Sequence, residues 1–192
     1  MAETILRIGS KNAGDRISAE DFATAEFEAP YRYERVKGRL AVMAPAGPDH
    51  RDTGRPFRRE LPYYWRLHQH IIEDIDFEGW VSTSDDDDRL PDICVYLKAS
   101  ATGERVPERV PDMIFEIVSE NLADQERDYI DKREEYHRIG VKEYVIIDRF
   151  KREALVLTWR QDDYAEQVLA ETAVYTTTLL PGLAVPLAEA FA

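Results

Sequence analysis

Short apolar runs alternate with polar, turn-forming segments along most of the 192-residue chain. The runs in "YRYERVKGRLAVMA" (31–44) predict a β-hairpin that turns at Lys37-Gly38, and "ALVLTWR" with "YAEQVLA" (154–170) predicts a second hairpin. Three further runs, at 91–97, 111–118 and 141–148, have the length and β-branched content of buried strands.

Two longer segments carry a helical pattern. In residues 50–70, apolar side chains fall along one side of a helix, but Pro62 lies inside the segment, so we expect a kink or a late start. The pattern from Asp124 to Ile139 is also helical, and Gly140 is well placed to end it. The order of hairpin, helix, strand, strand, helix, strand and hairpin predicts an α/β fold with a mixed sheet and helices packed against it.

Composition favours one globular domain over residues 1–192, with a loosely packed N-terminal segment (1–20) and a core from about residue 30 to 192. Hydrophobic residues make up 44% of the chain and charged residues 33%, and no apolar run is long enough to cross a membrane. The first residues do not read as a secretory signal. The single cysteine, Cys94, excludes an internal disulfide framework. We therefore expect a cytoplasmic protein.

The net charge of −13 argues against a protein that coats nucleic acid, but the charge is unevenly distributed. Residues 71–88 hold eight acids without a lysine or arginine, including the run 85–88, which we expect to form a solvated loop. Residues 51–70 hold five arginines and two acids. Four of these arginines fall near one helical face among aromatic residues and are the predicted DNA-binding residues: Arg51, Arg55, Arg59 and Arg66. In the alternative interpretation, the aromatic residues are core and the arginines pair with neighbouring acids.

Two of the predicted strands contain acids at positions where burying a charged carboxylate costs free energy. Side chains alternate along a strand, so Asp92 shares a face with Cys94, and Glu116 shares a face with Val118. If the two strands pair, one register brings Asp92 and Glu116 together, where they repel unless a cation joins them. Mg²⁺ suits such a pair because it needs only one or two protein carboxylates. Asp112, by contrast, is expected to open its strand at the solvent edge.

The second predicted helix carries polar residues at a spacing of four. Asp128, Lys132 and Tyr136 therefore lie on one helical face. Lys132 either forms a surface ion pair with Asp128, or places its ammonium near a scissile phosphate to stabilise developing charge.

Several fragments together resemble one known family. In order, they are "YERVKGRLAVMAP" followed by His50, "LPDICVYL", "VPDMIFEIVSEN", "RDYIDKREEYHRIGVKEYVIID" and "LLPGLAVPLAEAF". This pattern resembles the Uma-two family of the PD-(D/E)XK nuclease superfamily. The resemblance implies a restriction-endonuclease-like fold and a metal-dependent endonuclease acting on DNA. It also implies Asp92 and Glu116 as ligands of Mg²⁺ or Mn²⁺, and Lys132 as the catalytic lysine.

The chain departs from the superfamily pattern at the lysine. That lysine normally stands two residues after the strand acid, where this sequence has Val118, so the resemblance implies a lysine that has moved to the following helix, at Lys132. Glu34 matches a family position as a further ligand or water-positioning acid. His50 matches one as a phosphate or site-shaping contact, and a capping role for His50 stays open.

Three functions remain open from the sequence. The first is an active Mg²⁺-dependent endonuclease. The second is a catalytically inactive nuclease-fold module that works through protein contacts, including a homodimer paired through hairpin edges. The third is a phosphoesterase acting on a substrate other than nucleic acid.

Overall fold

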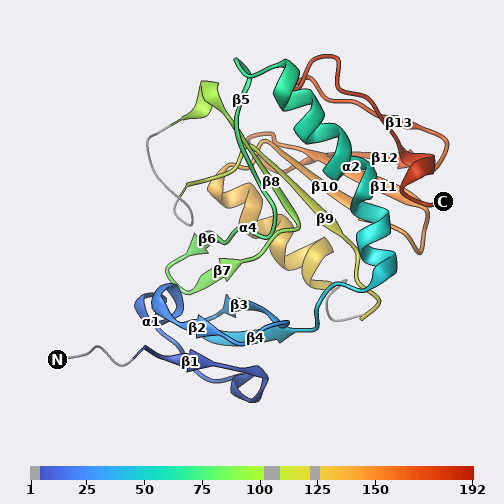
Figure 1. Cartoon of the computed structure of the whole chain (residues 1–192). Helices are drawn as coiled ribbons and strands as arrows, with labels where there is room; N and C mark the ends of the chain where they lie inside the picture. Colours follow the sequence, from blue (N-terminus) through green and yellow to red (C-terminus); the bar gives the residue numbers. More distant parts are fainter. Residues whose placement is uncertain (1–4, 102–108, 122–125) are drawn as a thin grey trace.

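The central element of the computed structural model, which describes residues 5–101, 109–121 and 126–192, is a six-stranded sheet (Figure 1). Strands β9 and β10 are parallel, and every other neighbouring pair is antiparallel. The predicted mixed sheet is therefore confirmed. In spatial order its strands are β12 (Ala165–Ala170), β11 (Glu153–Thr158), β10 (Glu143–Asp148), β9 (Met113–Ile117), β8 (Ile93–Leu97) and β5 (Ile72–Asp76).

A four-stranded sheet from the N-terminal half lies beside the central one (Figure 1). It contains β4 (Arg39–Met43), β3 (Arg32–Val36), β7 (Asp87–Arg89) and β6 (Val81–Ser84). Its β3–β4 hairpin turns at Lys37 (φ 52°) and Gly38 (φ 69°), which confirms the predicted turn. Two small pairs complete the strands: β1 (Arg7–Ile8) with β2 (Glu26–Phe27), and β13 (Val174–Tyr175) with β14 (Val185–Pro186).

Two principal helices pack on the central sheet, α2 (Pro48–Leu67) and α4 (Lys132–Ile139), and a π-helical turn, η3 (Arg127–Asp131), leads directly into α4. The shorter helices are α1 (Ala19–Thr24) and the 3₁₀ turns η1 (Ser10–Asn12), η2 (Lys98–Ser100) and η4 (Leu187–Glu189). Within the described ranges, no helix combines the length and the apolar character that a bilayer span requires. Residues 124 and 125 of the predicted second helix lie outside the described residues.

Helix α2 begins earlier than the sequence suggested and continues through Pro56 and Pro62, so a late start is wrong. Pro48 stands in the first turn, where a missing N–H costs nothing because that group has no helical partner. The interior prolines remove backbone donors, at a cost of about 3 kcal/mol each. Phe57 and Leu61, both fully buried against the sheet, offset this cost by burying apolar surface.

The two faces of the sheet carry separate cores, as the alternation predicted. Ile93 and Val95 of β8 face α2 and the C-terminal segment, whereas Cys94 and Tyr96 face α4. Figure 1 shows α2 and α4 on opposite sides of the sheet. A third core in the N-terminal half includes Ile8. It also includes Ile17, so the segment predicted as loosely packed is anchored within its described part.

Two acids lie deeper than expected. Asp112 is 4% exposed rather than at the solvent edge, because its Oδ2 accepts the N–H of Leu97 at 2.7 Å, at the end of β8. Asp88 is also buried, and its Oδ2 accepts from Arg35 Nε at 2.7 Å. The run 85–88 is thus only partly a solvated loop, since Asp87 and Asp88 belong to β7.

The end of α4 supports a stability prediction. Gly140 follows the helix with φ 89°, in the left-handed region where a side chain is strained. Gly140→Ala is expected to lower the free energy of unfolding by about 1–2 kcal/mol, as measured by urea denaturation. Gly140→Asn is the matched control and should cost less, because asparagine tolerates this conformation. Equal losses in the two variants would contradict this assignment.

Candidate active site

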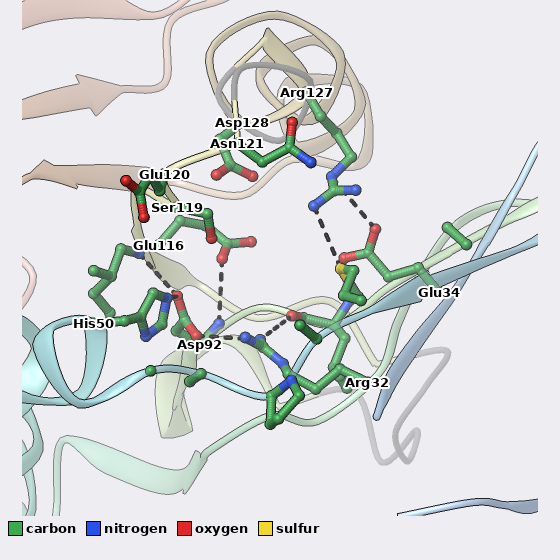
Figure 2. Close-up of a pocket in the computed structure, with 18 of the residues that line it drawn as sticks. Arg32, Glu34, His50, Asp92, Glu116, Ser119, Glu120, Asn121, Arg127 and Asp128 are labelled. Carbon is green, nitrogen blue, oxygen red and sulfur yellow. Dashed lines mark hydrogen bonds and ion pairs between the residues drawn. The ribbon is translucent and has the colours of Figure 1, made fainter. Parts of the chain in front are cut away.

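A pocket of about 680 Å³ opens at the end of the central sheet where β8 begins and β9 ends (Figure 2). Strands β3 and β4, the start of α2 and the π-helical turn complete its walls. The predicted site residues that line it are Glu34, His50, Asp92, Glu116, Asp128 and Lys132. Tyr136 reaches the same group from α4, with its hydroxyl 3.2 Å from Glu116 Oε1. The fold therefore brings together residues more than one hundred positions apart in the chain.

Strand register explains why Asp92 and Glu116 meet. Strands β8 and β9 are antiparallel with Ile93 opposite Phe115, so the next position places Asp92 opposite Glu116. The backbone N–H of Asp92 lies 3.4 Å from Glu116 Oε2. Both side chains are almost completely buried. The register and common face predicted from the sequence are present.

Asp92 is held as a carboxylate by several donors. Its Oδ2 accepts the Ile117 N–H at 2.8 Å and lies 3.3 Å from His50 Nε2, while its Oδ1 accepts from Arg32 at 3.2 Å. Burial raises the pKa of Asp92, but the contacts with His50, Arg32 and the Ile117 N–H outweigh it, so the pKa falls below its ordinary range. Figure 2 shows His50 and Arg32 converging on this carboxylate.

Lys132 stands among three carboxylates. Its Nζ donates to Glu116 Oε1 at 2.7 Å and lies 3.0 Å from Asp128 Oδ1 and 3.5 Å from Glu34 Oε1. The predicted pair with Asp128 is therefore present, but it is buried, and Glu116 shares the same ammonium. Burial opposes the charge on Lys132, yet the three carboxylates raise the pKa of the ammonium above its ordinary value. Lys132 is thus a protonated donor at neutral pH.

Glu116 has the opposite electrostatic balance. Burial raises the pKa of Glu116, and the negative charges of Asp128 and Asp92 raise it further. Lys132 lowers it only in part, so the pKa of Glu116 reaches about 8. In Glu34, burial likewise raises the pKa, but Lys132, Arg127 and Arg89 reverse the effect and bring it to about 2. The site thus contains Glu116, whose carboxyl protonates readily, beside Glu34 and Asp92, which stay ionised.

The chemistry of these donors fits a hard divalent cation. A carboxylate oxygen can accept two interactions, and Asp92 Oδ1 and Glu116 Oε2 each have one weak contact, at 3.2 and 3.4 Å. Over residues 5–101, 109–121 and 126–192, no three or more His, Cys, Asp or Glu side chains are grouped so that they could hold a metal ion together. Mg²⁺ needs only one or two protein carboxylates and keeps other positions for water and phosphate. Asp92 and Glu116 meet that requirement.

The four predicted DNA-binding arginines do not line this pocket. All four are exposed on α2. Arg55 pairs with Asp52, and Arg59 with Glu60 and Glu189, as the alternative interpretation expected. Arg66 lies over the ring of Tyr63. Arg51 has no carboxylate partner among the described residues, and its contribution to DNA binding stays a prediction.

Several arginines at the site were missed in the sequence, among them Arg32, Arg89 and Arg127. Arg32 contacts Asp92 and lies two positions before Glu34 on β3, so strand alternation could have placed both on one face. Arg89 is almost fully buried between Glu34, at 3.2 Å, and Glu135 of α4. No local signal identified it, because it follows four consecutive aspartates that indicated an exposed loop.

A model of the Uma2 protein family, described as "Putative restriction endonuclease", matches residues 19–188. The chain belongs to the Uma2 family. The match includes every predicted site residue, from Glu34 to Tyr136, and confirms the resemblance drawn from the sequence fragments. This Uma2 protein has no match among curated proteins.

A solved structure supports the fold of the Uma2 chain. It is described as "a putative nuclease belonging to DUF820 from Anabaena variabilis ATCC 29413", with 16% sequence identity and a TM-score of 0.70. The alignment covers 91% of this chain and 97% of the other. At this identity the likeness bears on fold alone, and with the family match it confirms the restriction-endonuclease-like α/β class.

The raised pKa of Glu116 predicts how the stability of this Uma2 protein depends on pH. Because the folded pKa (about 8) exceeds the ordinary 4.5, the stabilisation from protonated Glu116 is complete below pH 4.5 and is lost as pH rises through 8. Urea denaturation in EDTA should show a free energy of unfolding that falls by about 1–4 kcal/mol from pH 5 to 8.5. Glu116→Gln should lack most of this decrease.

Glu34 provides an internal comparison for this measurement. Its pKa of about 2 is below the ordinary value, so its stabilisation is present above pH 4.5 and is lost only as pH falls through 2. The two effects therefore occupy separate pH windows. Superimposable pH profiles for the wild-type protein and Glu116→Gln would show that Glu116 is ionised throughout.

Proposed function

We propose that this protein is a metal-dependent endonuclease that hydrolyses phosphodiester bonds in DNA. The observation that carries the proposal is the buried pair Asp92 and Glu116 at the pocket, with Lys132 Nζ 2.7 Å from Glu116. Two carboxylates beside a buried ammonium form an arrangement suited to phosphoryl chemistry, in which charge develops on phosphate oxygens. The family match, described as "Putative restriction endonuclease", supports the same class of reaction.

The site residues have separate roles in the proposed reaction. Asp92 and Glu116 would hold Mg²⁺ or Mn²⁺, which supplies Lewis-acid polarisation of the phosphate and activation of water when bound. Lys132 donates hydrogen bonds to the scissile phosphate or orients the attacking water. His50 fixes Asp92 through the 3.3 Å contact at Oδ2, and Tyr136 fixes Glu116 through its hydroxyl.

Glu34 acts through Lys132 rather than on the substrate. Its carboxylate is buried, is held by Arg89 at 3.2 Å and by the Leu90 N–H at 3.1 Å, and lies 3.5 Å from Lys132 Nζ. Asp128 contacts the same ammonium. Together they keep Lys132 charged and oriented toward Glu116. Lys132 thereby takes the place of the strand lysine, whose usual position holds Val118.

Cleavage and metal binding can be tested on the same preparation. Supercoiled plasmid and circular single-stranded DNA are incubated with the protein in Mg²⁺, in Mn²⁺ and in EDTA, and Mg²⁺ binding is measured by calorimetry. Metal-dependent nicking or linearisation is the expected result. Absence of both cleavage and metal binding would overturn the proposal and favour the non-catalytic module. Metal-dependent hydrolysis of bis(p-nitrophenyl) phosphate without DNA affinity would favour the phosphoesterase.

A further inference from the structure

A second pocket, of about 510 Å³, lies next to the active-site pocket. It is lined by Pro30, Arg32, Pro45, Ala46, Arg51, Arg58, Phe77 and Glu78. Arg32, Pro45 and Ala46 line both pockets, so the two form one continuous surface on either side of the Arg32 side chain. A polymer bound at the carboxylates therefore has a direct path into the second pocket, which we call the arginine–phenylalanine pocket.

Positive charge dominates the arginine–phenylalanine pocket, on a protein whose net charge is −13. Its one acid, Glu78, already has a partner, because Glu78 Oε1 lies 3.5 Å from Arg32 Nε. Arg51 and Arg58 have no carboxylate within ion-pair distance among the described residues. Two guanidinium groups from α2 that line one pocket attract an anion.

Arg58 is held in position by the helix that carries it. Its Nη1 donates to the carbonyl oxygen of Arg51 at 3.4 Å and lies against Gly54. A methyl group added at Gly54 would come within 2.9 Å of that nitrogen and 3.2 Å of Ile117. The guanidinium thus occupies space that a side chain at residue 54 would take. Gly54 thus lies between Arg58 and Ile117, whose N–H donates to Asp92.

The remaining wall is aromatic. Phe77 follows β5, is 40% exposed and lines the pocket together with the three arginines. The next residue, Glu78, has φ 60°, a left-handed conformation that turns the chain directly after the ring. A ligand with both an anionic group and a flat apolar face satisfies the arginines and Phe77 together. A nucleotide has both.

We propose that the arginine–phenylalanine pocket binds a nucleotide next to the scissile phosphate, with its phosphate on Arg51 and Arg58 and its unpaired base stacked on Phe77. The inference rests on the proposed endonuclease function and specifies its substrate as DNA that is single-stranded at this position. A base within a duplex is stacked on its neighbours and cannot also cover Phe77. Of the four arginines predicted from the sequence, only Arg51 belongs to this subsite, and Arg58 joins it.

Binding in EDTA tests the subsite separately from cleavage. The probe is a fluorescently labelled oligothymidylate of about 12 nucleotides, within the range of single-strand binding sites, followed by anisotropy. Phe77→Ala is expected to weaken binding by about tenfold, the lower part of the range for loss of one stacked base. The double variant Arg51→Ala/Arg58→Ala should reduce the slope of log K against log salt by about 0.7, because the contact with one phosphate is lost.

Matched controls decide between the subsite and general electrostatics. Arg55→Ala removes an exposed arginine from the same helix that pairs with Asp52 and lies outside the pocket, and should bind within twofold of wild type. An oligonucleotide with abasic positions should bind wild type and Phe77→Ala equally. The proposal is overturned if Phe77→Ala binds oligothymidylate like wild type, or if Arg55→Ala matches the double variant. If the wild-type protein binds oligothymidylate through Phe77 but does not cleave DNA, the endonuclease function is rejected and the nucleotide subsite is not.

Discussion

Glu116→Gln is expected to reduce the rate of metal-dependent DNA cleavage by about three orders of magnitude. The substitution keeps the size of the side chain but removes one of the two carboxylates that would hold the cation. Loss of several kcal/mol of charge stabilisation corresponds to this factor, since each 1.36 kcal/mol is tenfold in rate. Single-turnover cleavage of a labelled oligonucleotide, with Mg²⁺ titrated to saturation, measures the effect.

The glutamine should leave the fold intact, which makes the result interpretable. An amide oxygen can still accept from Lys132 Nζ and from the Tyr136 hydroxyl, at 2.7 and 3.2 Å in the native site. Glu73→Gln, the same chemical change at an exposed carboxylate paired with Arg109, is the control and should cleave at the wild-type rate. Cleavage by Glu116→Gln within tenfold of wild type would place the catalytic centre elsewhere.

Lys132→Met is expected to lower the free energy of unfolding by about 3–5 kcal/mol at pH 7, the range for breaking a buried ion pair from one side. The ammonium is 3% exposed and faces Glu116, Asp128 and Glu34, so its removal leaves buried negative charge without its principal neutralising partner. Part of the loss should be recovered as pH falls, because the remaining carboxyls then take up protons. Urea denaturation at pH 5.5 and 7 measures both effects.

A second substitution tests the cause. Lys132→Met combined with Asp128→Asn should be more stable than Lys132→Met alone, because a buried carboxylate 3.0 Å from the lost ammonium has also been removed. Lys151→Met, at a half-exposed lysine 3.6 Å from Asp148, is the surface control and should cost less than about 1 kcal/mol. If Lys132→Met is no more costly than Lys151→Met, the carboxylates have another source of compensation.

The arrangement of Asp92 and Glu116 could be predicted because strand alternation is strict. Once "PDICVYL" and "PDMIFEIVSE" are recognised as strands, the faces of Asp92 and Glu116 are fixed, and one antiparallel register brings them together. The turn at Lys37-Gly38 and the end of α4 at Gly140 follow equally local rules. These features depend on residues close in sequence, where the pattern contains the necessary information.

The remaining features depend on contacts between distant segments. Asp112 looked like a solvent-edge residue because nothing nearby shows that β8 ends with an N–H pointing at its carboxylate. Arg89 looked exposed after four aspartates, yet Glu34 and Glu135, 55 and 46 residues away, enclose it. The π-helical turn η3 before Lys132 could not be predicted from the sequence periodicity either. The spacing of four nevertheless placed Asp128, Lys132 and Tyr136 together correctly.

The only thiol in the chain lies on the strand that begins beside Asp92. Cys94 has no exposed surface, and burial raises the pKa of its thiol, so the native protein presents almost no reactive thiolate. A thiol reagent in solution can therefore modify it only during moments when β8 separates from its neighbours. The modification rate under native conditions reports how often that happens and gives the free energy of the opening. Cys94 is thus a built-in probe of the opening of β8, and no added label is needed.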